Sequence, residues 1–334
     1  MNERLVRTRN RLSGNDVQDT SSLSIQAAST IAVSYTASRR GVRSWPVKEW
    51  LLFVLFIGPN LLLFSIFSYW PMLYSGYLST VRWDMLGPVQ VGVGLDNYRY
   101  FLENETFHKV MWNTLYFTIG AVGGAIVVGL AFALLLNQPL KGRDGARAII
   151  FMPTLISGAV IGIVWAYIFD QRYGLIANGL RSIGLSSPDW LGDPQWAMPA
   201  LIIVYIWKNV GFATVIFLAG LQAIPRDLYE SAKVDGAGPI WRFKSVTLPM
   251  LSPIMFFVVV TSILNSFQAF DIINVMTRGG PVDATNTLIY YVYEQGFVAF
   301  NAGRGAAASI VLFTVMLFIT LFQLRYSERK VHYA

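Results

Sequence analysis

The chain has 334 residues, of which 54% are hydrophobic and only 13% carry a charge, and its formal net charge is +7. A soluble domain carries about 25% charged residues, so this composition excludes an ordinary soluble domain and indicates a protein that crosses a membrane several times. The sequence has no cysteine, which excludes disulfides, thiolate metal sites and cysteine nucleophiles.

Residues 1–46 are rich in Ser, Thr, Asn and Arg and hold no sustained apolar run. Such a segment cannot bury enough apolar surface to fold, so we expect a mostly disordered tail that serves as a tether. A transient interfacial helix around residues 26–37 is the alternative. A signal peptide is not expected, because no long apolar stretch follows the arginines.

Six nearly uncharged runs follow, each close to the roughly 20 residues that cross a bilayer core. In lipid the backbone must satisfy its own hydrogen bonds, so these runs are expected to be helices and not strands. The prediction is an all-α, polytopic membrane protein with six transmembrane helices. The predicted spans are residues 50–70, 114–136, 148–169, 198–219, 251–270 and 306–324.

Basic residues fix the predicted orientation. They cluster in four segments that lie on one side of the membrane if there are six spans, and the positive-inside rule makes that side cytoplasmic. We therefore expect a transmembrane domain over residues 47–325, with the 1–46 tail and a short 326–334 tail both in the cytoplasm. The four basic clusters are Arg39, Arg40, Arg43 and Lys48; Lys141, Arg143 and Arg147; Arg226, Lys233, Arg242 and Lys244; and Arg325, Arg329 and Lys330.

The polar segment 226–249 lies between the fourth and fifth predicted spans, on the cytoplasmic side. Residues 226–234 contain no helix breaker, and Gly236 offers the residue that commonly closes a helix at its C-terminal end. A second short helix is expected to begin at Pro239, where a missing N–H costs nothing. Small residues at the corner between these helices would let the surface of another protein approach closely.

This segment resembles the signature loop of ABC-importer permease subunits, which reads Glu-Ala-Ala, two residues, Asp-Gly-Ala, eight residues, Ile-x-Leu-Pro. Ser231 replaces an alanine of that pattern, and Val246 replaces its isoleucine. An ordinary cytoplasmic connector is the alternative. The matching positions are Glu230, Ala232, Asp235, Gly236, Ala237, Leu248 and Pro249. The resemblance implies coupling to ATPase subunits through Glu230, Ser231, Ala232, Asp235, Gly236 and Ala237.

Two segments on the outer side carry a second resemblance. Residues 92–101, GVGLDNYRYF, are similar to the VGLDNY element of sugar-importer permeases, and residues 278–291, RGGPVDATNTLIYY, look like the GGP-x-x-A-T-x-T-L-x-Y segment of the same group. The second segment is expected to form a turn and a short interfacial helix. From residue 50 onward the chain thus resembles the first permease subunit of carbohydrate-type ABC importers, the maltose and glycerol-3-phosphate group. This implies a type I ABC importer permease fold in the bacterial inner membrane.

The chain has no G-x-x-x-x-G-K-[ST] motif, so it is not expected to hydrolyse ATP or to act as an enzyme. The resemblance implies that two partner ATPase subunits hold ATP and Mg, that a second permease completes a heterodimer and that an extracytoplasmic protein delivers the solute. The implied solute is an oligosaccharide, glycerol-3-phosphate or a uronate. No metal or cofactor is expected in this chain, which has only two histidines.

Two alternatives stay open at this point. A self-sufficient secondary transporter would need intramembrane carboxylates or an inverted repeat for ion coupling, and the sequence shows neither. Two G-x-x-x-G motifs, at Gly120 and Gly124 and at Gly158 and Gly162, permit close helix contacts in lipid. Those contacts could lie within this chain or against a second subunit.

The resemblance to the maltose permease also places a solute site among the third, fourth and fifth spans. Aromatic faces with amide, hydroxyl and charged groups suit a sugar-like polyol, although the aromatic residues could equally be helix packing. The implied solute-binding residues are Thr154, Tyr205, Lys208, Asn209, Phe212, Phe267, Gln268 and Asp271, with Gly158 as a further candidate.

Lys208 is the only charged residue inside any predicted span. A lysine at the centre of an isolated span costs about 2.5 to 3.5 kcal/mol, so Lys208 should find an anion. That anion is either Asp271, which the helical rise places at a comparable depth, or an acidic group of the solute. We expect an ion pair between Lys208 and Asp271, for which an acidic solute competes.

Overall fold

The computed structural model describes residues 47–330, so the predicted 1–46 tail lies outside the described residues. The chain divides into two units, residues 1–65 and 66–334. Of the first unit, the apolar helix α2 (Val47–Phe64) is described. With η1 (Ser65–Tyr69) and α3 (Trp70–Leu78) it makes up a candidate membrane span, Trp50–Leu78.

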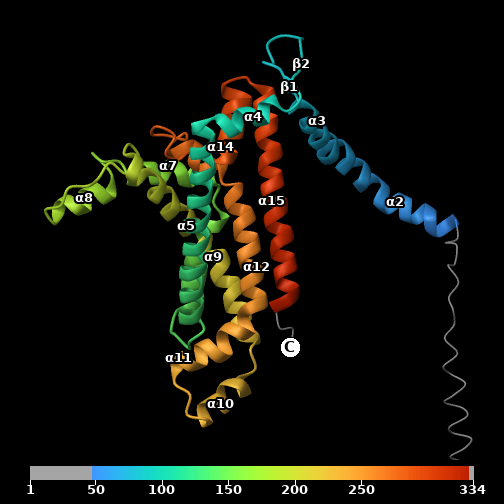
Figure 1. The fold of residues 1–334 in the computed structure, drawn as a ribbon. Helices are drawn as coiled ribbons and strands as arrows, with labels where there is room; N and C mark the ends of the chain where they lie inside the picture. Colours follow the sequence, from blue (N-terminus) through green and yellow to red (C-terminus); the bar gives the residue numbers. More distant parts are fainter. Residues whose placement is uncertain (1–46, 331–334) are drawn as a thin grey trace, which may run out of the picture. The chain divides into compact units, whose positions relative to one another are not determined.

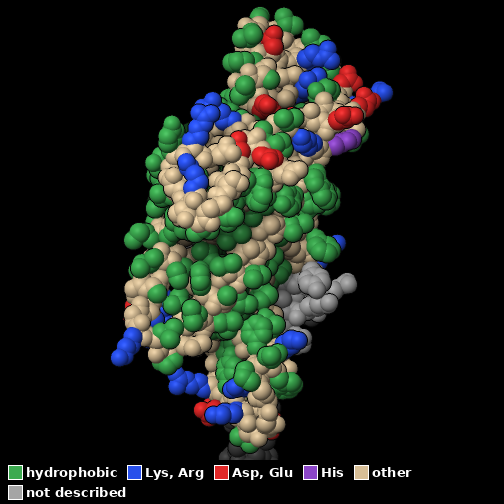
Figure 2. Space-filling view, turned by 90° about the vertical axis from the view of Figure 1, so that its left-hand side faces the viewer, with side chains coloured by type: hydrophobic (Ala, Val, Ile, Leu, Met, Phe, Trp, Pro, Cys, Tyr) green, Lys and Arg blue, Asp and Glu red, His purple; other side chains and the backbone are tan. Residues whose placement is uncertain are grey.

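Four long helices of the second unit run side by side (Figure 1). Within the described residues, five helices are long and apolar enough to cross a membrane, and the number is six if a bent pair of helices counts as one span. Hydrophobic side chains cover the middle of the face in Figure 2, and charged side chains gather toward its two ends. This distribution is typical of a protein that crosses a membrane. The four long helices are α5 (Glu105–Leu136), α9 (Pro194–Ala223), α12 (Leu248–Phe267) and α15 (Ala302–Lys330).

Glycines on α5 let it pack closely against α9. A Cβ atom on Gly120 would lie only 2.8 Å from the Cδ1 of Ile202, so a larger residue would force the Ile202 side chain to move. The contacts pair Gly120 with Ile202, Gly124 with Ile206, and Gly129 with Ala213. Because the residue numbers increase in the same order on both helices, α5 and α9 run parallel. In this structure the Gly120 motif therefore serves packing within the chain, and the C-terminal ends of α5 and α9 lie at the same end of the molecule.

The third predicted span is not one helix. Its two halves are bent by 103° at a short break, so the prediction of a continuous helix over residues 148–169 is wrong. Pro153 has no N–H to donate, and Ser157 adopts an extended backbone (φ −60°, ψ 140°) that starts a new helix. The elements of this bent span are α6 (Arg143–Phe151), η2 (Met152–Leu155) and α7 (Gly158–Ile168).

One end of the second unit holds short elements that brace the starts of α5 and α15 (Figure 1). Asn113 of α5 donates to the backbone oxygens of Asp283 (2.7 Å) and Asn286 (3.0 Å), which fastens the 277–287 loop to α5. The turn and short helix predicted for residues 278–291 are confirmed. The elements here are an antiparallel pair, β1 (Val81–Arg82) and β2 (Val91–Gly92), with α4 (Asp96–Glu103), α14 (Leu288–Tyr293) and η4 (Glu294–Val298).

A short peripheral helix, α8 (Leu175–Ser182), follows the bent third span through a tight turn. The carboxylate of Asp170 accepts hydrogen bonds from the backbone N–H groups of Tyr173 and Arg172. These bonds lower the pKa of Asp170, because they stabilise its charged form. This contribution to the turn is therefore present at neutral pH and is lost as the pH falls through the folded-state pKa.

The opposite end of the second unit carries the two short helices predicted between the fourth and fifth spans (Figure 1). The helix α10 (Arg226–Val234) is followed by Asp235 and then by Gly236, whose φ of +77° lies in the left-handed region. The N–H of Ala237 then bonds back to the oxygen of Ala232 (2.9 Å), which completes the helix cap. The helix α11 (Pro239–Arg242) follows and leads through η3 (Phe243–Thr247) into α12. Both predicted helices are confirmed.

Candidate functional site

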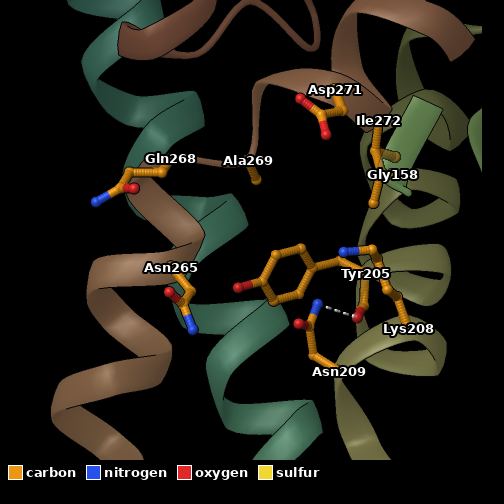
Figure 3. Close-up of a pocket in the computed structure, with 9 residues that line it drawn as sticks. All are labelled: Gly158, Tyr205, Lys208, Asn209, Asn265, Gln268, Ala269, Asp271 and Ile272. Atoms are coloured by element: carbon orange, nitrogen blue, oxygen red, sulfur yellow. Dashed lines mark hydrogen bonds between the residues drawn. The ribbon is translucent and has the colours of Figure 1, made fainter. Parts of the chain in front are cut away.

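A polar cavity of about 310 Å³ lies where α7, α9, α12 and α13 (Phe270–Met276) meet (Figure 3). Its volume is at the lower end of the range for small-molecule sites. Polar groups are rare at this depth in a membrane protein and usually have a function. The lining residues are Gly158, Tyr205, Lys208, Asn209, Asn265, Gln268, Ala269, Asp271 and Ile272.

Three of these residues come from one face of α9. Tyr205, Lys208 and Asn209 follow at the i, i+3 and i+4 spacing that brings side chains together on a helix. The Tyr205 ring packs edge-on against Phe117 of α5 with centroids 5.3 Å apart, and it points across the cavity toward α12 (Figure 3). The amide of Asn209 donates to the backbone oxygen of Tyr205 (2.9 Å), which holds its side chain along the helix.

The opposite wall comes from the end of α12 and the start of α13. The helix α12 ends at Phe267, and the chain turns through Gln268 and Ala269 before α13 begins. This turn carries Asp271 away from the axis of α12. Asn265, two residues before the end of α12, also lines the cavity and was not predicted from the sequence. Its spacing from Gln268, three residues, was the available signal.

The start of α7 closes the cavity beside Asp271. A Cβ atom on Gly158 would lie 2.9 Å from both the Cβ and the Oδ2 of Asp271, so glycine is needed for this approach. The first N–H groups of α7 have no helical acceptor and give its N-terminus a partial positive charge. The Asp271 carboxylate therefore lies beside the partially positive N-terminus of α7. The second motif glycine, Gly162, packs against Val275 of α13, so this motif also serves packing within the chain.

The predicted ion pair between Lys208 and Asp271 does not form. Among the side chains that the structure describes, the ion pairs within 4.0 Å are Arg99–Glu103, Arg143–Asp144 and Arg147–Asp144. The prediction was wrong because it placed Asp271 on a continuous fifth helix, whereas the chain turns after Phe267. Lys208 extends from α9 toward Gly158 and Asp271, but its amino group has no charged partner among the described residues (Figure 3).

The structure brings together five of the eight predicted solute-binding residues, Tyr205, Lys208, Asn209, Gln268 and Asp271. The other three do not line the cavity. Thr154 instead donates from its hydroxyl to the backbone oxygen of Lys208 (3.0 Å), which joins η2 to α9. Phe267 is buried and lines a separate apolar cavity between α5, α12 and α15, and Phe212 is half-buried on α9. A role of the five residues in solute binding stays a prediction.

The predicted coupling residues lie together on α10 and the corner after it. Glu230, Ser231, Asp235 and Gly236 are exposed, Ala232 is buried and Ala237 is half-buried. The hydroxyls of Tyr229 and Thr247 lie 3.0 Å apart and hydrogen bond, so α10 is joined directly to the helical segment that leads into α12. A force applied to α10 would therefore reach α12.

Residues 125–333 match the family described as "Binding-protein-dependent transport system inner membrane component". The chain belongs to this family. It is therefore the permease subunit of a binding-protein-dependent ABC importer, and the importer is favoured over a self-sufficient secondary transporter.

Named relatives support the same conclusion. The permease is 34% identical to the sn-glycerol-3-phosphate transport system permease protein UgpA of Yersinia pestis bv. Antiqua, over 85% of this chain and 96% of that protein. It is 35% identical to the protein of the same name from Agrobacterium fabrum, over 84% of this chain and 95% of the relative. Among solved structures, it is similar to a chain of a bacterial ABC transporter for import of the acidic polysaccharide alginate, with a TM-score of 0.73 and 27% identity over 85% of this chain and 97% of that chain.

These relationships fix the general role of the permease. It has the all-helical ABC importer permease fold and is a multi-pass protein of the inner membrane. It works in a complex with a solute-binding protein and ATPase subunits, and ATP hydrolysis resides in those ATPase subunits. The permease is therefore a non-catalytic subunit.

Proposed function

We propose that this permease forms half of a membrane pathway for an acidic, sugar-like solute, whose anionic group binds Lys208. The observation that carries the proposal is the Lys208 amino group, which lines the cavity without an ion pair among the described residues. A charge at this depth is expensive unless it meets an anion or water. A phosphate or carboxylate of the solute would supply that anion.

The relatives support an acidic solute. The glycerol-3-phosphate permease and the alginate importer are both named for solutes with acidic groups. The other polar groups of the cavity suit the hydroxyls of such solutes, because Tyr205, Asn209, Asn265 and Gln268 can each donate and accept hydrogen bonds.

Neutralising Lys208 tests this proposal. In proteoliposomes that hold the complete importer with its binding protein, Lys208→Gln is expected to reduce glycerol 3-phosphate uptake at least about tenfold, since losing one partner of a desolvated charge pair costs several kcal/mol. Lys141→Gln, at an exposed lysine outside the cavity, is the matched control and should leave uptake unchanged. Equal uptake by wild type and Lys208→Gln, at equal protein levels, would contradict the proposal.

A second permease is proposed to complete the pathway as a heterodimer. Asn265, Gln268 and Asp271 line the cavity but are exposed on the surface of this chain alone. Polar side chains at that depth cannot face lipid without a large cost. A second permease packed over this side would cover them and close the cavity.

The segment 226–249 is proposed to receive the ATPase subunits through Glu230, Ser231, Ala232, Asp235, Gly236 and Ala237. Beside these residues, α10 and α11 expose large apolar side chains, with Val234 87% and Trp241 54% exposed. Exposed apolar residues next to charged ones are typical of a protein interface. A surface of this kind at the end of the helices suits docking by another subunit.

Both termini are proposed to lie in the cytoplasm, with residues 47–325 as the transmembrane domain and 1–46 and 326–334 as tails. The chain has no cysteine, so single cysteines can report the orientation. Ser186→Cys is expected to react with an impermeant thiol reagent from outside the cell, and Ser231→Cys only from the cytoplasm; both serines are exposed. Reversed labelling would overturn this orientation.

A further inference from the structure

We propose that Asp271 is a specificity-determining residue that excludes solutes with a second anionic group. The cavity would then admit solutes with one anionic end and hydrogen-bond donors at the other. This inference rests on the proposed function, in which Lys208 takes the anionic group. Lys208 and Asp271 line the same cavity but come from different elements, α9 and α13, so they can act on different parts of one solute (Figure 3).

The hydrogen-bonding chemistry of Lys208 and Asp271 determines which chemical groups a solute must present to them. A lysine amino group only donates hydrogen bonds, whereas an ionised carboxylate only accepts them. Neither group has an ion pair within the described residues, so each can act on the solute. A solute bound with its anion at Lys208 must therefore present hydroxyl or other N–H or O–H groups to Asp271. A second anionic group cannot donate and would be repelled.

The position of Asp271 in the cavity wall is set by its close packing against α7. Its Cβ and Oδ2 lie against Gly158, and the next turn of α13 packs against α7, where Gly162 contacts Val275. The cavity of about 310 Å³ is also small, so the far end of a bound solute stays close to the carboxylate.

Two probes that differ at one end provide the test. Glycerol 3-phosphate and 3-phosphoglycerate share a phosphate and a middle hydroxyl, but the first ends in CH₂OH and the second in a carboxylate. Binding is measured on the purified complex of both permeases with the ATPase subunits, without the binding protein, because that protein has its own selectivity. Wild type is expected to prefer glycerol 3-phosphate. The measured quantity is the Kd for 3-phosphoglycerate divided by the Kd for glycerol 3-phosphate. Asp271→Asn is expected to reduce this ratio at least about tenfold, since like charges brought together cost several kcal/mol in recognition.

Three further variants make the result specific. Asp271→Glu retains the charge and should retain most of the preference. Asp96→Asn, at an exposed aspartate of α4 outside the cavity, should leave the ratio unchanged. Lys208→Gln reports the proposed function separately, because it should weaken binding of glycerol 3-phosphate itself.

The results distinguish the role of Asp271 from the proposed function of Lys208. If Lys208→Gln weakens binding but Asp271→Asn leaves the ratio as in wild type, the role of Asp271 is overturned and the proposed function stands. If Asp271→Asn weakened the binding of both probes equally, the residue would have a structural role, and this result would also overturn the inference. If wild type binds neither probe, or Lys208→Gln binds as well as wild type, the proposed function fails and the inference fails with it.

Discussion

Replacing Gly236 with valine is expected to reduce solute uptake at least about tenfold and to uncouple ATP hydrolysis from solute, while the permease still assembles in the membrane. Gly236 has a φ of +77°, and a Cβ there would meet no atom within 4 Å, so the effect comes from the backbone alone. A side chain in the left-handed region costs about 1–2 kcal/mol, and β-branched residues fit it worst. The corner between α10 and α11 would therefore change its shape. Uptake and solute-stimulated ATPase activity in proteoliposomes measure the result.

Gly142 offers a matched control for this substitution. It also has a positive φ, +81°, and open space around its Cβ position, but it precedes α6 and lies outside the coupling segment. Gly142→Val carries a similar backbone penalty and should retain coupling between ATP hydrolysis and uptake. Normal uptake by Gly236→Val, or equal uncoupling by both variants, would show that the α10–α11 corner does not transmit the motion.

Replacing Gly211 with alanine is expected to destabilise the permease by about 1–3 kcal/mol, the usual cost of overpacking. A Cβ on Gly211 would collide with the backbone oxygen of Ile150 and lie 2.7 Å from the Cα of Phe151. These are backbone atoms that no side-chain rotation can move, so α6 and η2 must shift from α9. The shift would strain the hydrogen bond from Thr154 to the Lys208 oxygen. Thermal unfolding of the purified complex should show a lower Tm, and uptake should fall.

Gly123→Ala is the control for this prediction. Gly123 is an exposed glycine on α5, and a Cβ there would meet no atom within 4 Å. Alanine has the higher helix propensity, so this variant should be as stable as wild type or slightly more stable. If Gly211→Ala had the same Tm as Gly123→Ala, the contact between α9 and the bent third span would not limit stability.

The sequence by itself determined the features that depend on local signals. The apolar runs predicted the membrane spans, because hydropathy over about 20 residues reports directly on burial in lipid. The helices at 226–234 and 239–242 were also predictable, since a glycine that can adopt positive φ and a proline at a first turn set their ends locally. The family could likewise be inferred from the spacing within this segment.

Only the tertiary structure decided how the cavity is built. The third predicted span is apolar throughout, so its hydropathy gave no sign of the 103° bend that places Gly158 beside Asp271. The end of α12 at Phe267 separates Asp271 from that helix, and this is why the expected pair with Lys208 does not form. Hydropathy shows that a helix lies in lipid, but the face it turns to its neighbours depends on close contacts with other helices. Asn265 therefore lines the cavity and Phe267 does not, although both residues lie within the same predicted span.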